Sequence, residues 1–236
     1  MDKSSTPSLT IFFPCYNEAG AIADLVERGD LVARELTADY EIIVVDDGSR
    51  DGSQDLLKNL QSKFPRLRLI VHESNRGYGA ALQSGFAGAT KDWVFYTDGD
   101  GQYDVFDLRR LFPLLQDGIS MVNGYKISRN DEIHRIIVGK IYLHLAKWLF
   151  NVHLRDINCD FRLIRRKVFE TIRLRQTGGV IGLELVKKME RAGYRIMDCP
   201  VPHYRRLYGK SQFFKFRSLL KTGWDMLTLW WELKKG

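Results

Sequence analysis

Apolar and polar residues alternate in blocks along the first half of the chain. Apolar runs of strand length occupy residues 9–13, 41–45, 67–72 and 93–97. Helix-length segments separate these runs, at residues 19–36, 55–64 and 79–89. A strand, a crossover helix and another strand, repeated in this way, predict an α/β fold with a mainly parallel sheet and helices on both faces.

The second half of the chain has a looser pattern. Strands are predicted at residues 120–125 and 194–201 and a helix at residues 181–192, whereas residues 156–164 have a mixed pattern without an assigned element. No internal repeat or low-complexity tract interrupts either half.

Two further segments of the second half predict amphipathic helices. Along residues 134–150, Lys140, His144 and Lys147 recur at i, i+4 and i+7 beside apolar faces, and residues 212–233 mix aromatic side chains with lysines. Most such helices pack on a sheet through their apolar face. Trp and Lys side by side also suit a membrane interface.

Length and composition fit one globular domain with a short appendage. The chain has 236 residues, 44% of them hydrophobic and 28% charged, which excludes wholesale disorder. We expect one domain over residues 1–211 and an amphipathic C-terminal element over residues 212–236. The polar N-terminus, the three scattered cysteines and the lack of an apolar stretch of about 18 residues predict a cytoplasmic location.

Charge is divided unequally along the chain. Residues 1–118 hold 12 basic and 19 acidic side chains, whereas residues 119–236 hold 24 and 10. The acidic front half argues against a nucleic-acid-binding protein. The division suggests an acidic site for a cation beside a basic surface for phosphate or anionic lipid, although solvated helices alone would also produce it.

Polar side chains follow three of the predicted strands. They are Tyr16-Asn-Glu after the first, Asp46-Asp-Gly-Ser after the second and Asp98-Gly-Asp after the fourth. Ligands of open α/β sheets bind beyond the carboxyl ends of the strands. We therefore expect these motifs to form one rim.

Asp98 and Asp100 are the sharpest chemical signal on this rim. Two carboxylates separated by one small residue at a strand end suit one Mg²⁺ or Mn²⁺ ion, with Gln102 as a further oxygen ligand. Asp-Gly pairs also make simple turns. The glycine-rich segment 75–80 opens a helix, so its backbone N–H groups are candidates to face an anion.

Four motifs follow one another in the front half: Pro14-Cys-Tyr-Asn-Glu18, Val45-Asp-Asp-Gly-Ser49, Asn75-Arg-Gly-Tyr-Gly79 and Thr97-Asp-Gly-Asp-Gly-Gln102. Their order resembles that of family 2 glycosyltransferases. In the back half stand Gly124-Tyr-Lys, Arg129, Arg135, Arg155-Asp-Ile-Asn-Cys-Asp-Phe-Arg-Leu-Ile-Arg-Arg166, Arg205 and Tyr208-Gly-Lys-Ser211. Over roughly residues 9–215 the chain resembles the dolichyl-phosphate mannosyltransferase and polyprenyl-phosphate glycosyltransferase branch.

The resemblance implies a GT-A (Rossmann-like) fold, a nucleotide-sugar donor and a divalent cation. The positions implied for donor binding are Pro14, Tyr16, Glu18, Val45, Asp47, Gly79, Asp98, Gly99 and Gln102. Those implied for the metal are Asp98, Asp100 and Gln102, the DXD motif and the glutamine after it. Two residues depart from many relatives, which have Pro in place of Val105 and Arg in place of Lys126.

The resemblance also implies an acceptor, polyprenyl or dolichyl phosphate. Its dianionic phosphate attacks the anomeric carbon without a strong base and inverts that centre. The candidate phosphate-binding residues are Lys126, Arg129, Arg135, Arg205, Arg206 and Lys210. Asp100, Asp156 and Arg135 are the candidate catalytic residues, with Asp156 orienting the acceptor or acting as base if the acceptor is an alcohol.

These inferences predict a hexose transfer, of mannose or glucose from GDP-mannose or UDP-glucose, in glycan biosynthesis. The enzyme would be peripheral on the inner face of the membrane, alone, as a homo-oligomer or with a membrane-protein partner. Two alternatives remain: a saccharide or glycolipid hydroxyl as acceptor, and a nucleotide- or lipid-binding module without turnover. Residue types do not choose between the sugars or the bases.

Overall fold

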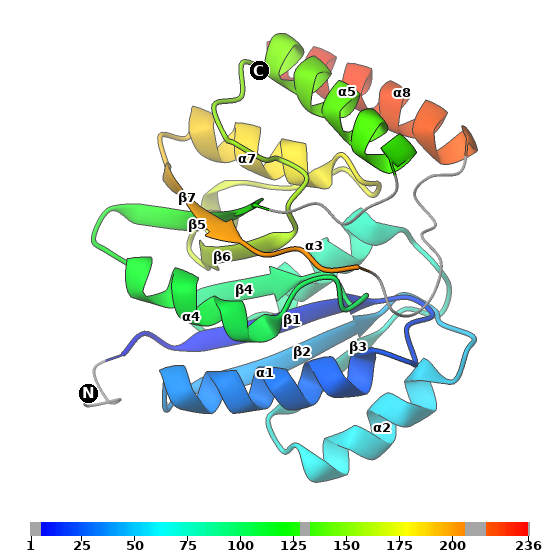
Figure 1. Ribbon diagram of the computed structural model, residues 1–236, viewed down its shortest axis with the longest axis vertical. Coiled ribbons are helices and arrows are strands. Elements are labelled where there is room, and N and C mark those ends of the chain that lie inside the picture. Colours follow the sequence, from blue (N-terminus) through cyan, green and yellow to red (C-terminus); the bar gives the residue numbers. More distant parts are fainter. Residues whose placement is uncertain (1–5, 128–132, 206–215, 236) are drawn as a thin grey trace.

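The computed structural model describes residues 6–127, 133–205 and 216–235, and for residues 133–136 and 216–219 the description is limited to the backbone. Figure 1 shows a central sheet with helices packed on both of its faces. The strands are β1 (Leu9–Cys15), β2 (Tyr40–Asp46), β3 (Leu67–Val71), β4 (Trp93–Thr97), β5 (Ile119–Lys126), β6 (Phe161–Arg165) and β7 (Arg195–Val201). The helices are α1 (Ile22–Leu36), α2 (Ser53–Lys63), α3 (Tyr78–Gly88), α4 (Leu108–Leu111), α5 (Ile133–Phe150), α6 (Val168–Thr171), α7 (Ile181–Arg191) and α8 (Phe216–Lys235).

The strand order in the described sheet is β3-β2-β1-β4-β6-β5-β7. β1, β2, β3 and β4 pair in parallel, and β5 pairs in parallel with β7. β6 runs antiparallel to both of its neighbours, β4 and β5. The mainly parallel α/β fold expected from the sequence is thereby confirmed, and β6 is the strand that the mixed pattern of residues 156–164 concealed.

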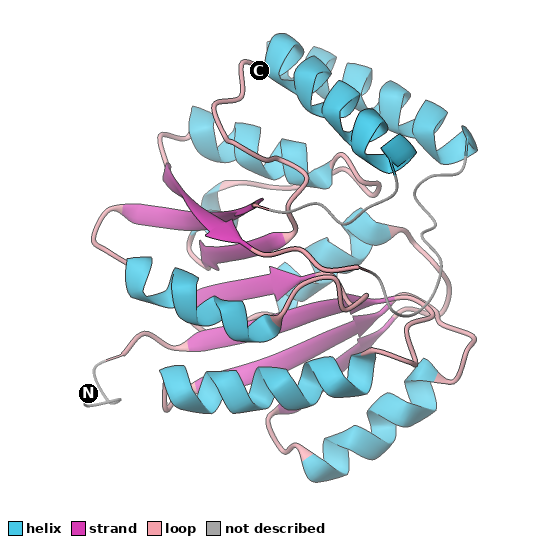
Figure 2. Ribbon diagram, in the orientation of Figure 1, coloured by secondary structure: helices cyan, strands magenta, loops and turns pink. Residues whose placement is uncertain are grey.

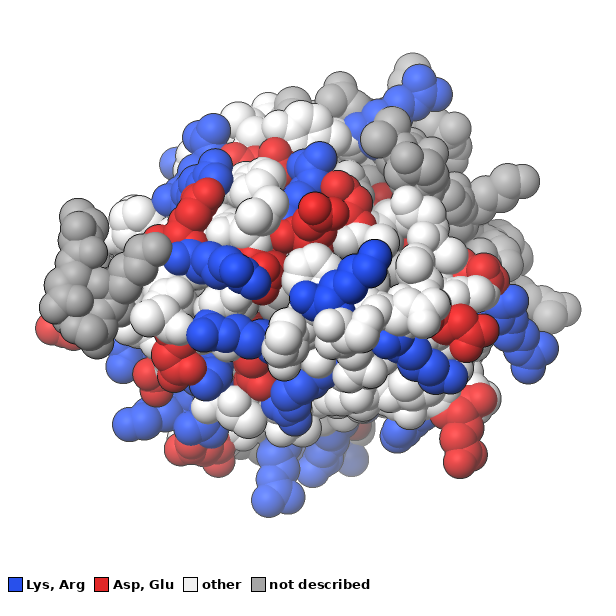
Figure 3. Space-filling model, turned by 90° about the horizontal axis from the view of Figure 1, so that it is seen from below, with Lys and Arg blue, Asp and Glu red and all other residues white. Residues whose placement is uncertain are grey.

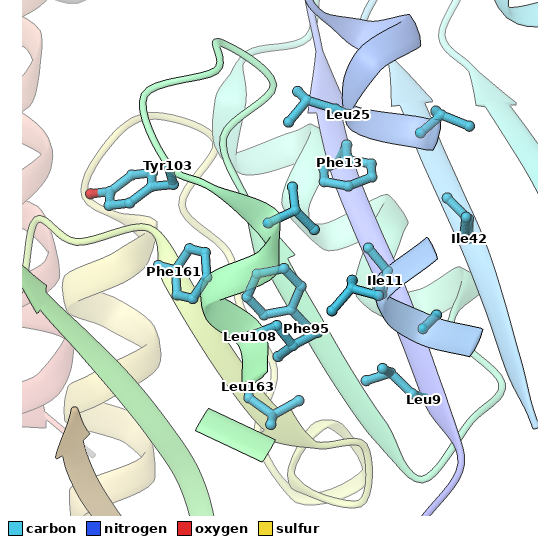
Figure 4. Packing of buried hydrophobic residues seen from close by; sticks show 14 of the residues in the cluster. Leu9, Ile11, Phe13, Leu25, Ile42, Phe95, Tyr103, Leu108, Phe161 and Leu163 are labelled. Atoms are coloured by element: carbon cyan, nitrogen blue, oxygen red, sulfur yellow. The ribbon is translucent and has the colours of Figure 1, made fainter. Parts of the chain in front are cut away.

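One face of the sheet is covered by α1, α2 and α4. Leu9, Ile11 and Phe13 alternate along β1 and point to this face, where Leu25 of α1 and Leu108 of α4 pack on them. Figure 4 shows this layer from close by, with Phe95 and Phe161 extending it across β4 and β6. Successive side chains of a strand point to opposite faces, so the same strand supplies two cores.

The other face is covered by α3, α5, α7 and α8, as the helices in Figure 2 show. The ring of Phe12 of β1 contacts that of Phe86 of α3 there, and Met189 of α7 belongs to the same buried cluster. Met226 and Leu229 of α8 lie in the same buried cluster. The C-terminal helix is therefore packed onto the domain through one of its faces.

α5 and α8 lie side by side as the outermost layer on this side of the molecule (Figure 1). Each helix leaves a stripe of large apolar side chains exposed. These residues, which we call the apolar stripes, are Ile137, Ile141, Leu145 and Trp148 on α5 and Leu220, Trp224, Leu227 and Trp231 on α8. Among the described residues, no helix has the length and apolarity needed to cross a membrane.

Charge is mixed on the face drawn in Figure 3. In the described part of the chain, Lys and Arg lie among Asp and Glu there, without a continuous patch of one sign. Nucleic-acid surfaces normally require a basic patch or stripe, and this face does not offer one.

Candidate active site

The carboxyl ends of β1, β2 and β4 meet at one edge of the sheet, because these three strands are parallel neighbours. The backbone N–H of Asp47, just after β2, donates to the carbonyl of Cys15 at the end of β1 over 2.8 Å. A Cβ atom on Gly99, just after β4, would lie 2.4 Å from the carbonyl oxygen of Pro14. Only a glycine lets the two loops approach this closely. The structure thus brings the three polar motifs of the sequence together.

Asp98 and Asp100 stand at the centre of this edge. Asp100 is buried, with 6% of its surface exposed, and its Oδ1 accepts the backbone N–H of Gln102 over 3.0 Å. Asp98 is half-buried, and its Oδ1 accepts a hydrogen bond of 2.7 Å from the Tyr78 hydroxyl. Burial, followed by the negative charges of Asp160 and Asp100, raises the pKa of Asp98 well above its usual value.

Asp160 is a third carboxylate at this edge, and it was not among the predicted site residues. β6 is antiparallel to β4 with Thr97 opposite Phe161, so the residue before β6 lies beside the residue after β4. Asp160 therefore faces Asp98. Its Oδ1 accepts a hydrogen bond of 3.2 Å from the Tyr96 hydroxyl.

The side chain of Arg162 lies next to Asp160 and to the tyrosine that donates to it. This arginine is fully buried, and its guanidinium donates to the Tyr96 hydroxyl over 2.8 Å and to the Asn123 side-chain oxygen over 2.8 Å. It also lies 3.8 Å from Asp160 Oδ1. A fixed cation and a fixed hydroxyl therefore hold the carboxylate in place.

These carboxylates suit a divalent cation shared with a ligand. No set of three His, Cys, Asp or Glu side chains in the described residues is arranged to hold a metal without help. Mg²⁺ in particular is often bound by one or two carboxylates together with substrate phosphates. Burial is the first cause of the raised pKa of Asp98, and the negative charges of Asp160 and Asp100, which such a cation would neutralise, come after it. Asp98 and Asp100 thus fit a metal that arrives with a diphosphate.

Gln102 links this edge to the chain after β7. Its side-chain N–H donates to the Tyr204 carbonyl over 3.2 Å, and the Tyr204 N–H donates to the Gln102 carbonyl over 2.8 Å. The amide oxygen is the atom of this side chain that would serve a metal. Arg205 follows directly and is exposed.

Asp47 lies at the neighbouring strand end with both carboxylate oxygens engaged. Oδ1 accepts the N–H of Arg76 and Oδ2 that of Gly77, each over 2.9 Å. His72 Nδ1 lies 2.6 Å from Oδ1, and its Nε2 lies 2.9 Å from the Ser84 hydroxyl. Asp47 therefore fixes the loop that opens α3. His72 was missed because a lone histidine at a strand end carries no sequence signal.

The glycine-rich loop before α3 does not present all of its N–H groups to solvent. The N–H groups of Arg76 and Gly77 are bound to Asp47, and Gly79 donates to the Thr177 carbonyl over 2.8 Å. A Cβ atom on Gly79 would lie 2.3 Å from the Gln176 carbonyl oxygen. These three N–H groups are already bound within the protein, and the expectation that N–H groups of this loop face an anion stays a prediction for the other donors. Gly79 allows the close approach of the two segments.

The remaining donor candidates line the same edge. Pro14 and Val45 are buried and opposite each other in the β1–β2 register, whereas Tyr16 is 36% exposed at the end of β1. Glu18 is half-buried, and its carbonyl accepts the N–H groups that start α1. The Tyr16 side chain is thus exposed just after β1, whose last residue pairs with the last residue of β2.

Lys126 and Asp156 form a pair beside the carboxylate cluster. Lys126 Nζ donates to the Asn158 carbonyl over 2.5 Å and lies 3.9 Å from Asp156 Oδ2. Asp156 is buried and also accepts the N–H of Asn158 over 2.9 Å. The positive charge of Lys126 acts on Asp98 as well, where it opposes the rise in pKa.

The other predicted phosphate-binding residues are less completely described. Arg129, Arg206 and Lys210 lie outside the described residues, and Arg135 is placed by its backbone in the first turn of α5. The structure therefore brings Lys126, with Asp156 beside it, next to the acidic cluster.

The fold and this edge define an α/β protein with its ligand site at the carboxyl ends of parallel strands. A model of the family described as glycosyl transferase family 2 matches residues 10–173. The chain belongs to this family.

Similar proteins indicate which branch of the family this chain resembles. The chain is 26% identical over 230 residues to an undecaprenyl-phosphate 4-deoxy-4-formamido-L-arabinose transferase of Aeromonas hydrophila subsp. hydrophila, covering 97% of this chain and 69% of that protein. It is 29% identical over 225 residues to the transferase of the same description from Pseudomonas fluorescens, covering 93% and 64%. The chain spans about two thirds of the length of these relatives. They confirm the resemblance to the polyprenyl-phosphate branch.

Solved structures confirm the fold. Glucosyl-3-phosphoglycerate synthase of Mycobacterium tuberculosis, in complex with Mn²⁺, UDP and phosphoglyceric acid, superposes with a TM-score of 0.75 at 18% identity over 97% of this chain and 80% of that one. The same enzyme with Mg²⁺ and UDP gives 0.71 at 16% identity over 96% and 80%.

Proposed function

We propose that this protein is a metal-dependent, inverting glycosyltransferase that moves a sugar from a nucleoside diphosphate to a polyprenyl phosphate at a membrane surface. The observation that carries the proposal is the cluster of Asp98, Asp100 and Asp160 at the carboxyl edge of the sheet. Family membership supplies the reaction class. The names of the relatives support undecaprenyl phosphate, or a similar lipid, as the acceptor.

The donor would lie along the edge from β2 to β4. Tyr16 and Asp47, with Pro14, Glu18 and Val45 around them, stand where the nucleoside would bind. Asp98, Asp100 and the Gln102 oxygen would hold Mg²⁺ or Mn²⁺, with Gly99 giving the close approach of the backbone. When bound, the cation would neutralise the charge that develops on the departing diphosphate.

The acceptor phosphate would approach beside Lys126. An alkyl phosphate is mostly dianionic at neutral pH, since its second pKa is about 6. It would attack the anomeric carbon directly, so the protein needs to position it and screen its charge. Lys126 supplies one such charge, and Arg129, Arg135, Arg205, Arg206 and Lys210 are the remaining candidates. A single displacement would invert the anomeric centre.

We place Asp160 rather than Asp156 beside the acceptor, on the basis of the contacts that each carboxylate makes. Asp156 is occupied by the Asn158 N–H and faces Lys126, which favours a role in positioning that lysine. Asp160 faces Asp98 and is held by the Tyr96 hydroxyl. We therefore propose that Asp160 orients the acceptor, or serves as base if the acceptor is a hydroxyl. The second acceptor class, a saccharide or glycolipid hydroxyl, stays in the proposal because Asp160 is placed to serve as its base.

The apolar stripes of α5 and α8 are the proposed contact with the membrane. Trp148 is 80% exposed and Trp224 is 71% exposed. Lys234 and Lys235 lie over the rings of Trp230 and Trp231, a mixture typical of interfacial helices. A lipid-linked acceptor has to be taken from a bilayer, and the inner face of the membrane remains our expectation.

The transferred sugar is the least constrained part of the proposal. A hexose, mannose or glucose, was the expectation, whereas the relatives are named for 4-deoxy-4-formamido-L-arabinose. The test is a transfer assay with Mn²⁺ or Mg²⁺, short polyprenyl phosphate and a panel of GDP- and UDP-linked hexoses and arabinose-type sugars. Labelled lipid with one donor supports the proposal and identifies the sugar. Transfer to free saccharides with none to lipid phosphate would overturn the acceptor.

A further inference from the structure

Tyr78 lies at the edge of the sheet that carries Asp98, and the proposed reaction gives it no role. It is the first residue of α3, and its hydroxyl donates to Asp98 Oδ1 over 2.7 Å. In the described part of the chain, no hydrogen bond to Asp98 Oδ2 accompanies this contact. The two oxygens of the carboxylate are therefore unequal before any ligand arrives.

The backbone around Tyr78 is fixed from two sides. On one side the Asp47 carboxylate accepts the N–H groups of Arg76 and Gly77. On the other side Gly79 donates to the Thr177 carbonyl. The backbone is thus held at three donors, two just before Tyr78 and one just after it, which fixes the point from which the hydroxyl reaches Asp98.

The segment that holds Gly79 is itself anchored by a buried carboxylate. Glu184 of α7 is fully buried and accepts the N–H groups of Arg175 and Gln176 over 2.8 to 3.0 Å. Its Oε1 also lies 2.6 Å from Lys188 Nζ. The position of Tyr78 thus depends on two elements beyond its own helix.

A carboxylate with one oxygen already bonded favours coordination through the other. Mg²⁺ demands near-octahedral geometry, whereas Ca²⁺ takes six to eight oxygens and accepts a carboxylate through both. Removing a hydrogen bond to a ligating carboxylate commonly lowers the metal affinity about 10- to 100-fold. We propose that the Tyr78 hydroxyl engages Asp98 Oδ1 so that Oδ2 alone is presented, which selects small octahedral cations over Ca²⁺. The inference rests on the proposed function, because it assumes that Asp98 is a metal ligand.

The test is a binding measurement on the full chain. Mn²⁺ and Ca²⁺ are titrated into protein saturated with UDP, and in parallel with GDP, with free Mn²⁺ followed by electron paramagnetic resonance and Ca²⁺ by competition. The variant is Tyr78→Phe, which removes only the hydroxyl. The matched control is Tyr40→Phe, because the Tyr40 hydroxyl also donates to a carboxylate, Asp30, over 2.7 Å at the opposite end of the sheet.

We expect Tyr78→Phe to weaken Mn²⁺ binding about 10-fold or more and to reduce the preference for Mn²⁺ over Ca²⁺ by a similar factor. Tyr40→Phe is expected to leave both constants unchanged. If Tyr78→Phe keeps the wild-type preference, the inference is wrong and the metal site stands. If the wild-type protein binds neither cation with either nucleotide, the proposed metal site fails and the inference fails with it. Thermal unfolding of both variants checks that they fold.

Discussion

At the scale of single residues, the carboxylates at the strand ends differ in the groups that they already bind. Asp47 and Asp156 have backbone N–H partners and buried surroundings. Asp98 and Asp160 are half-buried and face each other, with hydroxyl groups as their donors. We therefore place the acceptor beside the second pair, whereas Asp100, which is also buried and accepts the Gln102 N–H, stays in our proposal as a metal ligand.

Separate substitutions of the two acceptor candidates, Asp160 and Asp156, test this assignment. Asp160→Asn should lower kcat for transfer by at least about 100-fold, because it removes the charge beside Asp98. Asp156→Asn should cost less than about 10-fold, because Asp156 acts through Lys126. Both are measured at saturating donor, with circular dichroism to confirm folding. A larger loss in Asp156→Asn would return the acceptor role to that residue.

At the scale of elements, the first four strands were predictable and β6 was not. β1 to β4 are continuous apolar runs, and the parallel order of their ends predicted the rim. β6 contains Arg162, a buried charge whose partners come from β4 and β5. A sequence pattern does not show that an arginine will be satisfied inside a core. Because β6 was missed, its neighbour Asp160 was missed as well.

The partners of the glycine-rich loop were not predictable for a similar reason. Its N–H groups suggested an anion site, and three of them, those of Arg76, Gly77 and Gly79, are bound by Asp47 and Thr177. The second partner is about a hundred residues away in sequence. Contacts of that range depend on the whole fold, so local spacing did not indicate them.

Glu184 should be costly to change because it anchors the segment behind that loop. Glu184→Gln places an amide N–H₂ group where backbone N–H donors point, and it removes the ion pair with Lys188. We expect the free energy of unfolding to fall by about 2 kcal/mol, measured by urea denaturation. Glu170→Gln is the control, because Glu170 forms an exposed pair with Arg166, and it should change stability by less than about 0.5 kcal/mol. Equal effects of the two changes would contradict the anchoring role.

The apolar stripe of α8 gives a prediction at the same scale. Trp224→Glu should reduce binding to anionic vesicles about 10-fold or more, because it replaces an exposed interfacial aromatic with a charge. Leu31→Glu on α1 is the control, since Leu31 is 49% exposed on a different helix, and it should bind as the wild type does. The measurement is cosedimentation with vesicles of defined composition. Equal binding by both variants would exclude α8 as the membrane contact.

At the scale of the whole molecule, one short segment lies between α8, which carries one of the apolar stripes, and α3, which contacts the carboxylates at the strand ends. A Cβ atom on Gly178 would lie 2.9 Å from Asp225 Oδ2 of α8. The neighbouring Thr177 holds α3, whose Tyr78 contacts Asp98. A lipid held by α5 and α8 would thus lie next to the elements that shape the site. This arrangement suits an enzyme that takes one substrate from a membrane and the other from water.

In our proposal the catalytic centre lies at the edge that carries Asp98, Asp100 and Asp160. The most direct measurement compares transfer of labelled sugar to polyprenyl phosphate by the wild-type protein and by Asp100→Ala, with Mn²⁺ present and after chelation. Asp39→Asn is the control, because Asp39 lies just before β2, at the opposite end of the sheet, and its side chain is 65% exposed. We predict metal-dependent transfer by the wild type and the control, and a loss of at least about 100-fold in Asp100→Ala. Full transfer by Asp100→Ala, or transfer that survives chelation, would contradict the account.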